Sequence, residues 1–198
     1  GMDCYVGVDL AATSDLTAVA YLVVQDGTYY FKTHYYLPES ALKDKADKEL
    51  YKYWKQQGYL TVTSGNVTDY DYITADMLRY ADVVNIQSVG YDKYNATQWA
   101  IDSTEQGLPL EEYPQTLGNF NMPTRELERL ILSGKAVIDN NEINRYCFRN
   151  VTLKSDYNGN VKPNKAVDKK KIDGTIAMIQ ALGMYLRNPR FSNEIITI

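Results

Sequence analysis

The chain has 198 residues, of which 44% are hydrophobic and 23% are charged, as in ordinary globular proteins, so disordered and fibrous classes are excluded. Its longest apolar run, at 18–24, is far shorter than the ~20 residues of a membrane-spanning helix. Two cysteines and one histidine make a disulfide framework, zinc chemistry and a Ser-His-Asp triad poor hypotheses, so carboxylates are the expected catalytic groups.

Three strands are predicted at the start of the chain, at 4–10, 17–24 and 29–37, where apolar, β-branched and aromatic residues dominate. An Asp-Gly pair at 26–27 marks a tight turn between the second and third of these strands. The chain therefore opens with a strand meander. The single histidine, His34, falls in the third strand and is expected to be a half-exposed sheet residue.

Helical and strand-like segments alternate in the middle of the chain. Residues 38–57 are rich in Ala, Leu, Lys and Glu and predict a helix. The spacing of apolar residues predicts a second helix over 69–85. A strand at 89–92, a helix over 95–106 and a strand around 110–113 then follow one another, and this succession implies parallel neighbouring strands.

The last third of the chain adds two helices and a hairpin. A helix is predicted to open at Pro123 and to run to residue 133. The Asn-Gly pair at 158–159, after the apolar residues 151–153, is the strongest local hairpin signal. Apolar residues at helical spacing predict an amphipathic helix over 172–186. With no internal repeat or linker, the sequence predicts one α/β domain over residues 1–198.

Three aspartates follow apolar residues at the boundaries of predicted elements. Asp9 ends the first strand, Asp92 ends the strand at 89–92, and Asp173 lies in the first turn of the last helix. Carboxylates at the edge of a core are costly unless they are paired or bound to a cation. Because sites in open α/β sheets form outside the carboxyl ends of strands, the three are candidates to converge on hard cations. Taken singly, each is better explained as a helix cap or turn residue.

The net charge of −4 opposes binding to nucleic acid, but the charge is distributed unevenly. Residues 154–171 contain six lysines and two aspartates, a local charge of +4. Such a segment is either a positively charged surface that binds a polyanion or a turn whose lysines are solvated. Trp54, which lies among lysines, is the aromatic candidate for substrate contact. The candidate DNA-binding residues are Lys154, Lys162, Lys165 and Lys171.

Five segments resemble, in order, the motifs of the nuclease domain of tailed-phage terminase large subunits. They span nearly the whole chain, and although each is weak alone, the ordered set is fairly specific. The segments are 7–18 (GVDLAATSDLTA), 91–95 (YDKYN), 123–130 (PTRELERL), 158–165 (NGNVKPNK) and 171–177 (KIDGTIA).

The resemblance implies an RNase H-like fold, in which parallel strands extend an antiparallel three-stranded meander and helices cover both faces of the mixed sheet. It implies that Asp9, Asp92 and Asp173 are catalytic and hold two divalent cations, Mg²⁺ or Mn²⁺, for phosphodiester hydrolysis. Asp15 would be an auxiliary metal ligand, and a structural cap explains it equally well. Lys171 either steadies the scissile phosphate or is an exposed lysine of the first helical turn.

The resemblance also implies a metal-dependent DNA endonuclease that cuts concatemeric phage DNA during genome packaging. A complete large terminase carries an ATPase motor, whose phosphate loop reads Gly-x-x-x-x-Gly-Lys-Ser/Thr. Residues 133–136 (SGKA) lack the upstream glycine and the hydroxyl residue, so the chain is expected to be the C-terminal nuclease domain of a longer protein. The implied partners are double-stranded DNA, an N-terminal ATPase domain, the small terminase subunit and the portal. The resemblance implies no association with a membrane and a location in the host cytoplasm.

Other functions are compatible with the same carboxylates. Another RNase H-like nuclease, such as a junction resolvase or an RNA–DNA hybrid nuclease, would share the metal core and differ in its substrate groove. A non-catalytic DNA-clamp or motor-docking module predicts that at least one of the three aspartates is replaced, and all three are present. An actin-like ATPase is excluded because its phosphate turn needs glycines, and residues 9–15 contain none.

Overall fold

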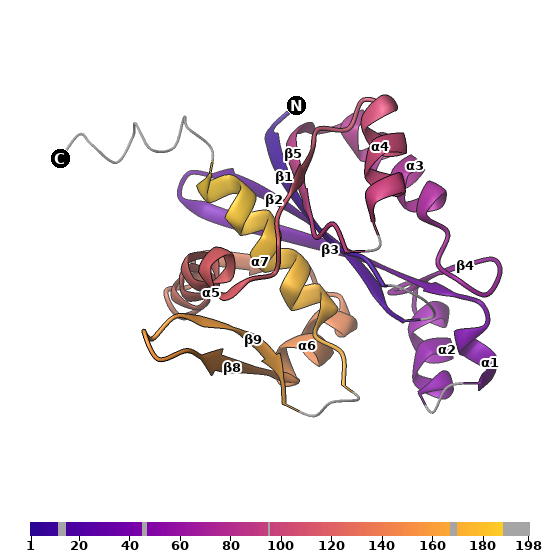
Figure 1. Cartoon of the computed structure of the whole chain (residues 1–198). Helices are drawn as coiled ribbons and strands as arrows, with labels where there is room; N and C mark the ends of the chain where they lie inside the picture. Colours follow the sequence, from indigo (N-terminus) through magenta and orange to yellow (C-terminus); the bar gives the residue numbers. More distant parts are fainter. Residues whose placement is uncertain (12–14, 45–46, 95, 167–169, 188–198) are drawn as a thin grey trace.

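A mixed β-sheet forms the centre of the protein in the computed structural model, which describes residues 1–11, 15–44, 47–94, 96–166 and 170–187 (Figure 1). The strands are β1 (Asp3–Asp9), β2 (Thr17–Gln25), β3 (Thr28–Pro38), β4 (Thr61–Thr63), β5 (Asn85–Tyr91), β6 (Leu110–Glu112), β7 (Ala136–Ile138), β8 (Val151–Ser155) and β9 (Val161–Lys165). In the described residues, the sheet has the order β4-β3-β2-β1-β5-β6, with β7 beside β3, and β8 pairs with β9 as a separate hairpin.

The strand directions agree with the predicted mixed sheet. β1, β2 and β3 form an antiparallel meander, and the turn between β2 and β3 places Asp26 and Gly27 at positive φ. β5 runs parallel to β1, and β6 runs parallel to β5. The α/β prediction of a three-stranded meander extended by parallel strands is therefore confirmed.

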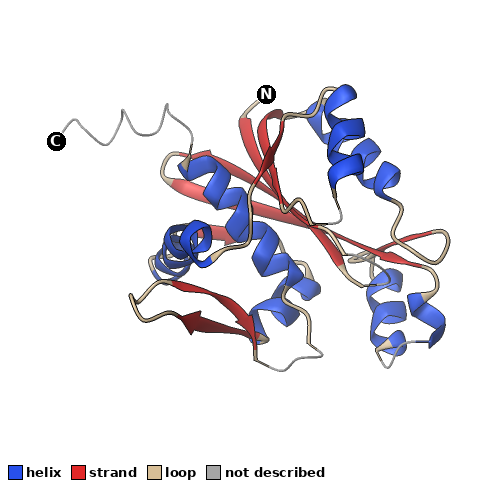
Figure 2. Cartoon of the chain, viewed as in Figure 1, coloured by secondary structure: helices blue, strands red, loops and turns tan. Residues whose placement is uncertain are grey.

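Helices cover both faces of the sheet (Figure 2). They are α1 (Ala41–Asp44), α2 (Lys48–Gln56), α3 (Tyr70–Ala81), α4 (Thr97–Glu105), α5 (Leu117–Leu132), α6 (Glu142–Arg149) and α7 (Asp173–Leu186). The core has two clusters, one with apolar residues of α2, α5, α6 and α7, and the other with those of α3 and α4. None of the helices in the described ranges has the length and apolar character needed to cross a membrane.

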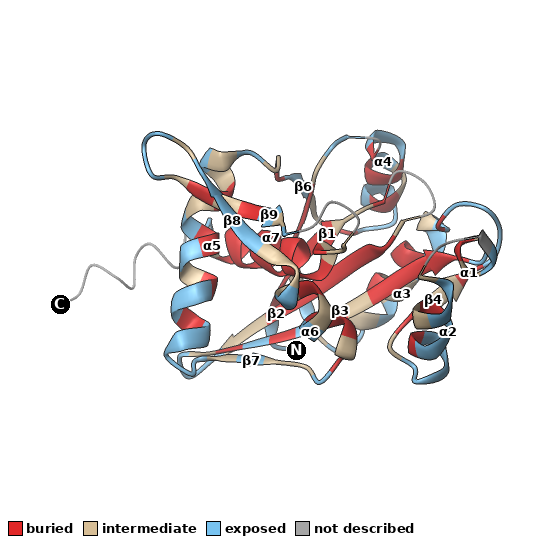
Figure 3. Cartoon of the chain, turned by 90° about the horizontal axis from the view of Figure 1, so that it is seen from below, coloured by how far each residue is buried: buried red, intermediate tan, exposed pale blue. Residues whose placement is uncertain are grey.

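The last helix, α7, lies at the centre of the molecule rather than on its surface (Figure 3). Every residue from Gly174 to Tyr185 is buried, so the prediction of an amphipathic helix is wrong. The helix packs on β1, β2 and β5 and is covered by α5 and α6, which leaves it no solvent face. A Cβ atom on Gly7 of β1 would lie 2.1 Å from the carbonyl oxygen of Ala177, so this close approach requires glycine.

Several helix boundaries differ from the predictions. The helix predicted over 38–57 is two helices, α1 and α2, and residues 45–46 between them lie outside the described part. The helix predicted over 69–85 ends at Ala81, and the following residues lead into β5. The strands β4 and β7 and the helix α6 were not predicted, because the two strands have only three residues each and the helix has a largely polar composition.

The helix α5 begins six residues before Pro123, which was predicted to open it. Thr116 is the N-cap, and its side chain accepts a hydrogen bond from the Asn119 amide. Proline inside a helix leaves the carbonyl four residues earlier without its usual donor. Here that carbonyl belongs to Asn119, and it accepts a hydrogen bond of 2.7 Å from the Tyr113 hydroxyl. The helix therefore continues through the proline because another residue satisfies the freed carbonyl.

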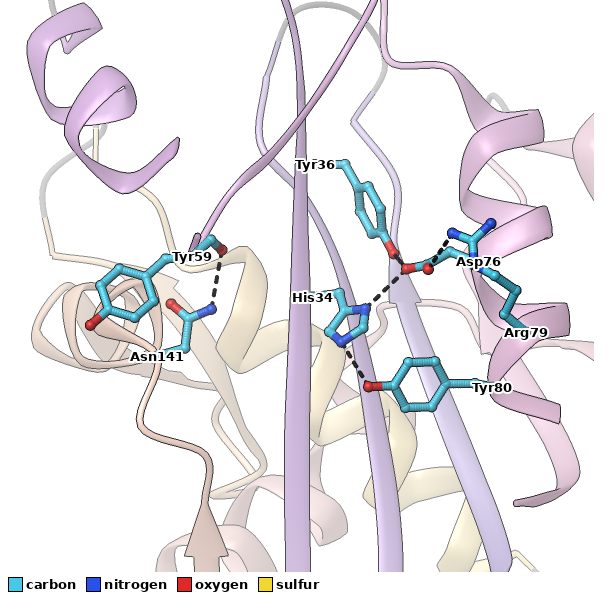
Figure 4. Close-up of polar contacts among 7 residues, drawn as sticks. All are labelled: His34, Tyr36, Tyr59, Asp76, Arg79, Tyr80 and Asn141. Carbon is cyan, nitrogen blue, oxygen red and sulfur yellow. Dashed lines mark hydrogen bonds and ion pairs between the residues drawn. The ribbon is translucent and has the colours of Figure 1, made fainter. Parts of the chain in front are cut away.

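A polar network around Asp76 joins α3 to the sheet (Figure 4). The Asp76 carboxylate accepts hydrogen bonds from His34 Nδ1 at 3.0 Å, from Arg79 at 2.7 Å and from the Tyr36 hydroxyl. Burial alone would raise the pKa of Asp76, but these bonds outweigh it and hold the pKa below its usual range. The second ring nitrogen of His34 lies 3.0 Å from the Tyr80 hydroxyl. The half-buried His34 thus has a structural role, at the edge of the second core cluster.

Candidate carboxylate site

The candidate site lies where the parallel strands β1 and β5 end. Their register pairs Val8 with Tyr91, so the next residues along the two strands, Asp9 and Asp92, lie side by side. This is the carboxyl edge of the parallel part of the sheet, where α/β proteins place their ligands. The structure therefore brings together two of the aspartates that were predicted to converge.

Gln115, in the connection from β6 to α5, bridges these two aspartates. Its side-chain amide donates to Asp9 Oδ1 at 2.8 Å, and its main-chain N–H donates to Asp92 Oδ2 at 2.9 Å. The other oxygen of Asp92, Oδ1, accepts from the Tyr94 amide at 3.0 Å. No sequence motif singled out Gln115, since a lone glutamine after Pro114 carries no signal of its own.

Asp173 reaches the same site from the first turn of α7. After burial, the negative charge of Asp173 is the largest influence that raises the pKa of Asp9. Asp173 Oδ2 is buried and accepts no hydrogen bond from any described residue. A buried carboxylate oxygen without a donor is costly, and a bound cation would satisfy it.

The carboxylates of Asp9 and Asp173 are held in a state that resists ionisation. Burial raises the pKa of Asp9 most, and the charges of Asp173 and, to a smaller extent, Asp92 raise it further. The hydrogen bond from Gln115 and the positive charge of Lys165 act in the opposite direction. The pKa of Asp9 is therefore well above that of an ordinary aspartate, as expected for a buried acid beside other acids.

The pKa of Asp173 is also raised, first by burial and then by the charge of Asp15. The amide of Asp173 itself and the ammonium groups of Lys165 and Lys171 lower it. The positive charge of Lys165 thus lowers the pKa of both Asp9 and Asp173.

The donor set fits Mg²⁺ or Mn²⁺ in its chemistry. Among the described residues, no three His, Cys, Asp or Glu side chains already form a compact metal-binding group. The acidic groups at this sheet edge are carboxylates, the hard oxygen ligands that these cations prefer. The unsatisfied Oδ2 of Asp173 and the raised pKa values of Asp9 and Asp173 are the features that a divalent cation would relieve.

Asp15 and Lys171 form an ion pair at the margin of this site. The Lys171 side chain is 12% exposed, so it is not the solvated first-turn lysine that was the alternative to phosphate contact. Asp15 also accepts a hydrogen bond from the Leu16 amide at 3.0 Å, as a loop cap would. The pair ties the start of β2 to the residues that lead into α7.

We expect Asp15→Asn to destabilise the protein more than it weakens metal binding. The substitution removes the partner of a largely buried lysine and weakens a loop cap, which costs about 0.5–2 kcal/mol in the free energy of unfolding. Thermal melting and Mn²⁺ titration of the variant measure the two effects separately. Unchanged stability with a tenfold loss of Mn²⁺ affinity would instead make Asp15 a metal ligand.

The hairpin within the basic segment contacts Gln115 through Lys162. The predicted hairpin is confirmed, with β8 antiparallel to β9 and Lys154 opposite Lys162. Lys162 donates to the Gln115 carbonyl at 3.0 Å, and Lys154 is exposed. Lys169 lies among residues 167–169, outside the described part of the chain. The hairpin therefore forms a hydrogen bond to Gln115, the residue that bridges Asp9 and Asp92.

Contacts to α5 fix the position of the hairpin. The Val161 amide donates to Asn121 Oδ1 at 2.9 Å, and Arg125 donates to the Gly159 carbonyl at 2.7 Å.

Trp54 is buried in the core against Tyr146, so its prediction as a substrate contact is wrong. Its apolar neighbours in the core explain the aromatic residue without a ligand.

Comparison with known families gives one match over nearly the whole chain. The family of the terminase large subunit, endonuclease domain, matches residues 1–188. The chain is 29% identical to the large terminase subunit of Enterobacteria phage HK97, over 90% of this chain and 36% of that protein. It is 31% identical to protein YmfN of Escherichia coli K12, over 98% of this chain and 46% of that protein. The chain thus spans less than half the length of these curated relatives.

Solved structures show the same fold. The crystal structure of the HK97 large terminase superposes with a TM-score of 0.84 at 28% identity, over 92% of this chain and 39% of that chain. The large terminase nuclease of thermophilic phage G20c, with bound magnesium, has a TM-score of 0.60 at 13% identity, over 90% and 79% of the chains. The nuclease domain of phage SPP1, with bound Mn, has a TM-score of 0.53 at 14% identity, over 93% and 86%.

Proposed function

The chain belongs to the family of terminase large subunit endonuclease domains, and from this we propose that it hydrolyses duplex DNA with the help of divalent cations. The observation that supports the proposal is that Asp9 and Asp92 follow the paired residues at the carboxyl edge of β1 and β5, with the charge of Asp173 acting on Asp9. Asp9 comes from β1, Asp92 from the end of β5 and Asp173 from α7. Carboxylates are the hard oxygen ligands that Mg²⁺ and Mn²⁺ prefer, and those of Asp9 and Asp173 are buried.

We assign Asp9, Asp92 and Asp173 as the ligands of two divalent cations. When bound, such cations lower the pKa of a water molecule for attack on phosphorus and stabilise the departing 3′ oxygen. The three carboxylates hold the cations, and no histidine base is needed. The solved relatives with bound magnesium and Mn support the choice of metals.

Duplex DNA would approach over the hairpin and the lysines beside the carboxylates. Lys162 and Lys165 lie on β9, and Lys165 exerts its charge on Asp9 and Asp173. A phosphate placed near the carboxylates therefore meets positive charge from the hairpin. The chain has no sequence signature of a base-reading element, so we infer that binding depends on phosphate contacts and has little sequence preference.

We expect the double variant Lys162→Gln, Lys165→Gln to weaken DNA binding equally on all sequences. Each lost phosphate contact reduces the slope of log affinity against log salt by about 0.9 for duplex DNA. Binding measured in EDTA over a series of salt concentrations gives this slope without cleavage. The matched control is Lys52→Gln, Lys55→Gln on α2, which we expect to leave the slope unchanged. An unchanged slope in the hairpin variant would place the DNA groove elsewhere.

The biological role that fits the family is the cutting of concatemeric phage DNA during packaging. In this proposal, the chain is the C-terminal nuclease domain of a longer protein with an N-terminal ATPase motor, which acts with the small terminase subunit and the portal in the host cell. The HK97 relative, which is longer than this chain, is consistent with such an arrangement.

The choice of substrate separates this function from that of other RNase H-like nucleases. We expect the chain to cut a DNA duplex in Mn²⁺ in preference to an RNA–DNA hybrid or a four-way junction of the same sequence. Cleavage rates on the three labelled substrates measure this directly. Preferential cleavage of the hybrid or of the junction would favour the corresponding alternative, and binding without cleavage of any substrate would favour a DNA-clamp module.

A further inference from the structure

One residue, Gln115, contacts three parts of the proposed active site. Its side-chain amide donates to Asp9, its main-chain N–H donates to Asp92, and its carbonyl oxygen accepts from Lys162. The three partners come from β1, from the residue after β5 and from β9. No other group in the described structure is seen to contact both strand-end aspartates and the hairpin.

The backbone on either side of Gln115 is held firmly. Tyr113 donates its amide to the Tyr91 carbonyl at 2.7 Å, which ties this segment to the end of β5. The Pro114 carbonyl accepts from the Thr116 amide at 2.8 Å and from the Asn119 side chain at 2.9 Å. Thr116 then caps α5. Gln115 is therefore presented to the aspartates from a segment that is anchored on both sides.

We propose that Gln115 is a positioning residue that orients the Asp9 carboxylate for metal binding. This inference rests on the proposed function. Because the amide bonds Asp9 Oδ1, it restrains the rotation of the carboxylate and leaves Oδ2 as the oxygen that Gln115 does not bond. Groups that hydrogen-bond a metal-ligating side chain in this way commonly change metal affinity by about 10–100-fold when they are removed.

The variant Gln115→Met isolates the side-chain contact. Methionine has a similar length but no amide, and it keeps both the main-chain N–H that bonds Asp92 and the carbonyl that accepts Lys162. Any effect on metal binding therefore reports the contact with Asp9. The matched control is Gln106→Met at the end of α4, whose amide bonds the Asp102 carbonyl away from the site.

Calorimetric titration with Mn²⁺, in the absence of DNA, tests the proposal. We expect Gln115→Met to bind Mn²⁺ about 10–100-fold more weakly than the wild type, and Gln106→Met to bind it as the wild type does. Melting in EDTA should stay close to that of the wild type, because the main-chain bonds of Gln115 remain. Plasmid cleavage by Gln115→Met should recover toward the wild-type rate as Mn²⁺ is raised.

Two results separate failure of this inference from failure of the proposed function. If the wild type binds Mn²⁺ and cleaves DNA, but Gln115→Met binds Mn²⁺ within threefold of it, the positioning role is overturned. If the wild type itself neither binds Mn²⁺ nor cleaves DNA, the proposed function fails and the inference fails with it.

Discussion

Asparagine in place of Asp9, Asp92 or Asp173 is expected to reduce DNA cleavage by about 10³-fold or more while the fold stays intact. Metal ions contribute several kcal/mol of charge stabilisation to the transition state of phosphoryl hydrolysis. Because about 1.4 kcal/mol corresponds to a tenfold change in rate, the loss of one charged ligand reaches this size. Single-turnover cleavage of a labelled duplex measures the effect.

The control for these variants is Asp3→Asn, at the other end of β1. Asp3 is exposed and bonds the side chains of Asn85 and Gln87, away from the candidate site. We expect this variant to cleave at the wild-type rate. Full activity in any one of the three site variants would remove that aspartate from the catalytic set.

Asp9→Asn is expected to raise the melting temperature of the metal-free protein at pH 8. Burial and the charge of Asp173 raise the pKa of Asp9 from 3.8 to about 8 in the folded protein. A group whose pKa is raised on folding stabilises the protein at low pH, and that stability is lost as the pH rises through the raised pKa. The wild type therefore loses stability between about pH 4 and pH 8, whereas asparagine does not ionise.

At pH 8, Asp9→Asn is expected to increase the free energy of unfolding by about 1 kcal/mol or more. For a domain of this size, 1 kcal/mol corresponds to a rise of about 2–4 °C in the melting temperature. At about pH 4, where the loss has barely begun, the wild type and Asp9→Asn should melt at similar temperatures in EDTA. Added Mn²⁺ should stabilise the wild type at pH 8 by binding to the folded state, and should stabilise the variant much less. If Asp9→Asn melts well below the wild type at pH 8 in EDTA, the carboxylate is structural.

The sequence was sufficient to predict the strands that carry Asp9 and Asp92. Both strands are short apolar runs that end in an aspartate, and a βαβ succession makes neighbouring strands parallel, so the two carboxylates were expected at one edge. The hairpin was likewise predictable, because Asn158-Gly159 is a local turn signal that needs no tertiary context.

Features that depend on tertiary packing could not be predicted in the same way. The periodicity of α7 predicts an amphipathic helix, yet the sheet, α5 and α6 bury it on all sides. Pro123 signals a helix start, but the Tyr113 hydroxyl satisfies the carbonyl that the proline leaves free, and α5 continues. Gln115 gives no pattern at all, since its role depends on three partners that are distant in the sequence.

Nicking of a supercoiled plasmid decides whether the chain is a metal-dependent nuclease. The wild type and Asp9→Asn are each incubated with the plasmid in Mn²⁺, in Mg²⁺ and in EDTA. We expect the wild type to produce nicked and linear DNA with either metal and none in EDTA, and we expect Asp9→Asn to leave the plasmid supercoiled throughout. Cleavage by the wild type in EDTA, cleavage by Asp9→Asn at the wild-type rate, or intact plasmid with both metals would contradict metal-dependent hydrolysis at this site.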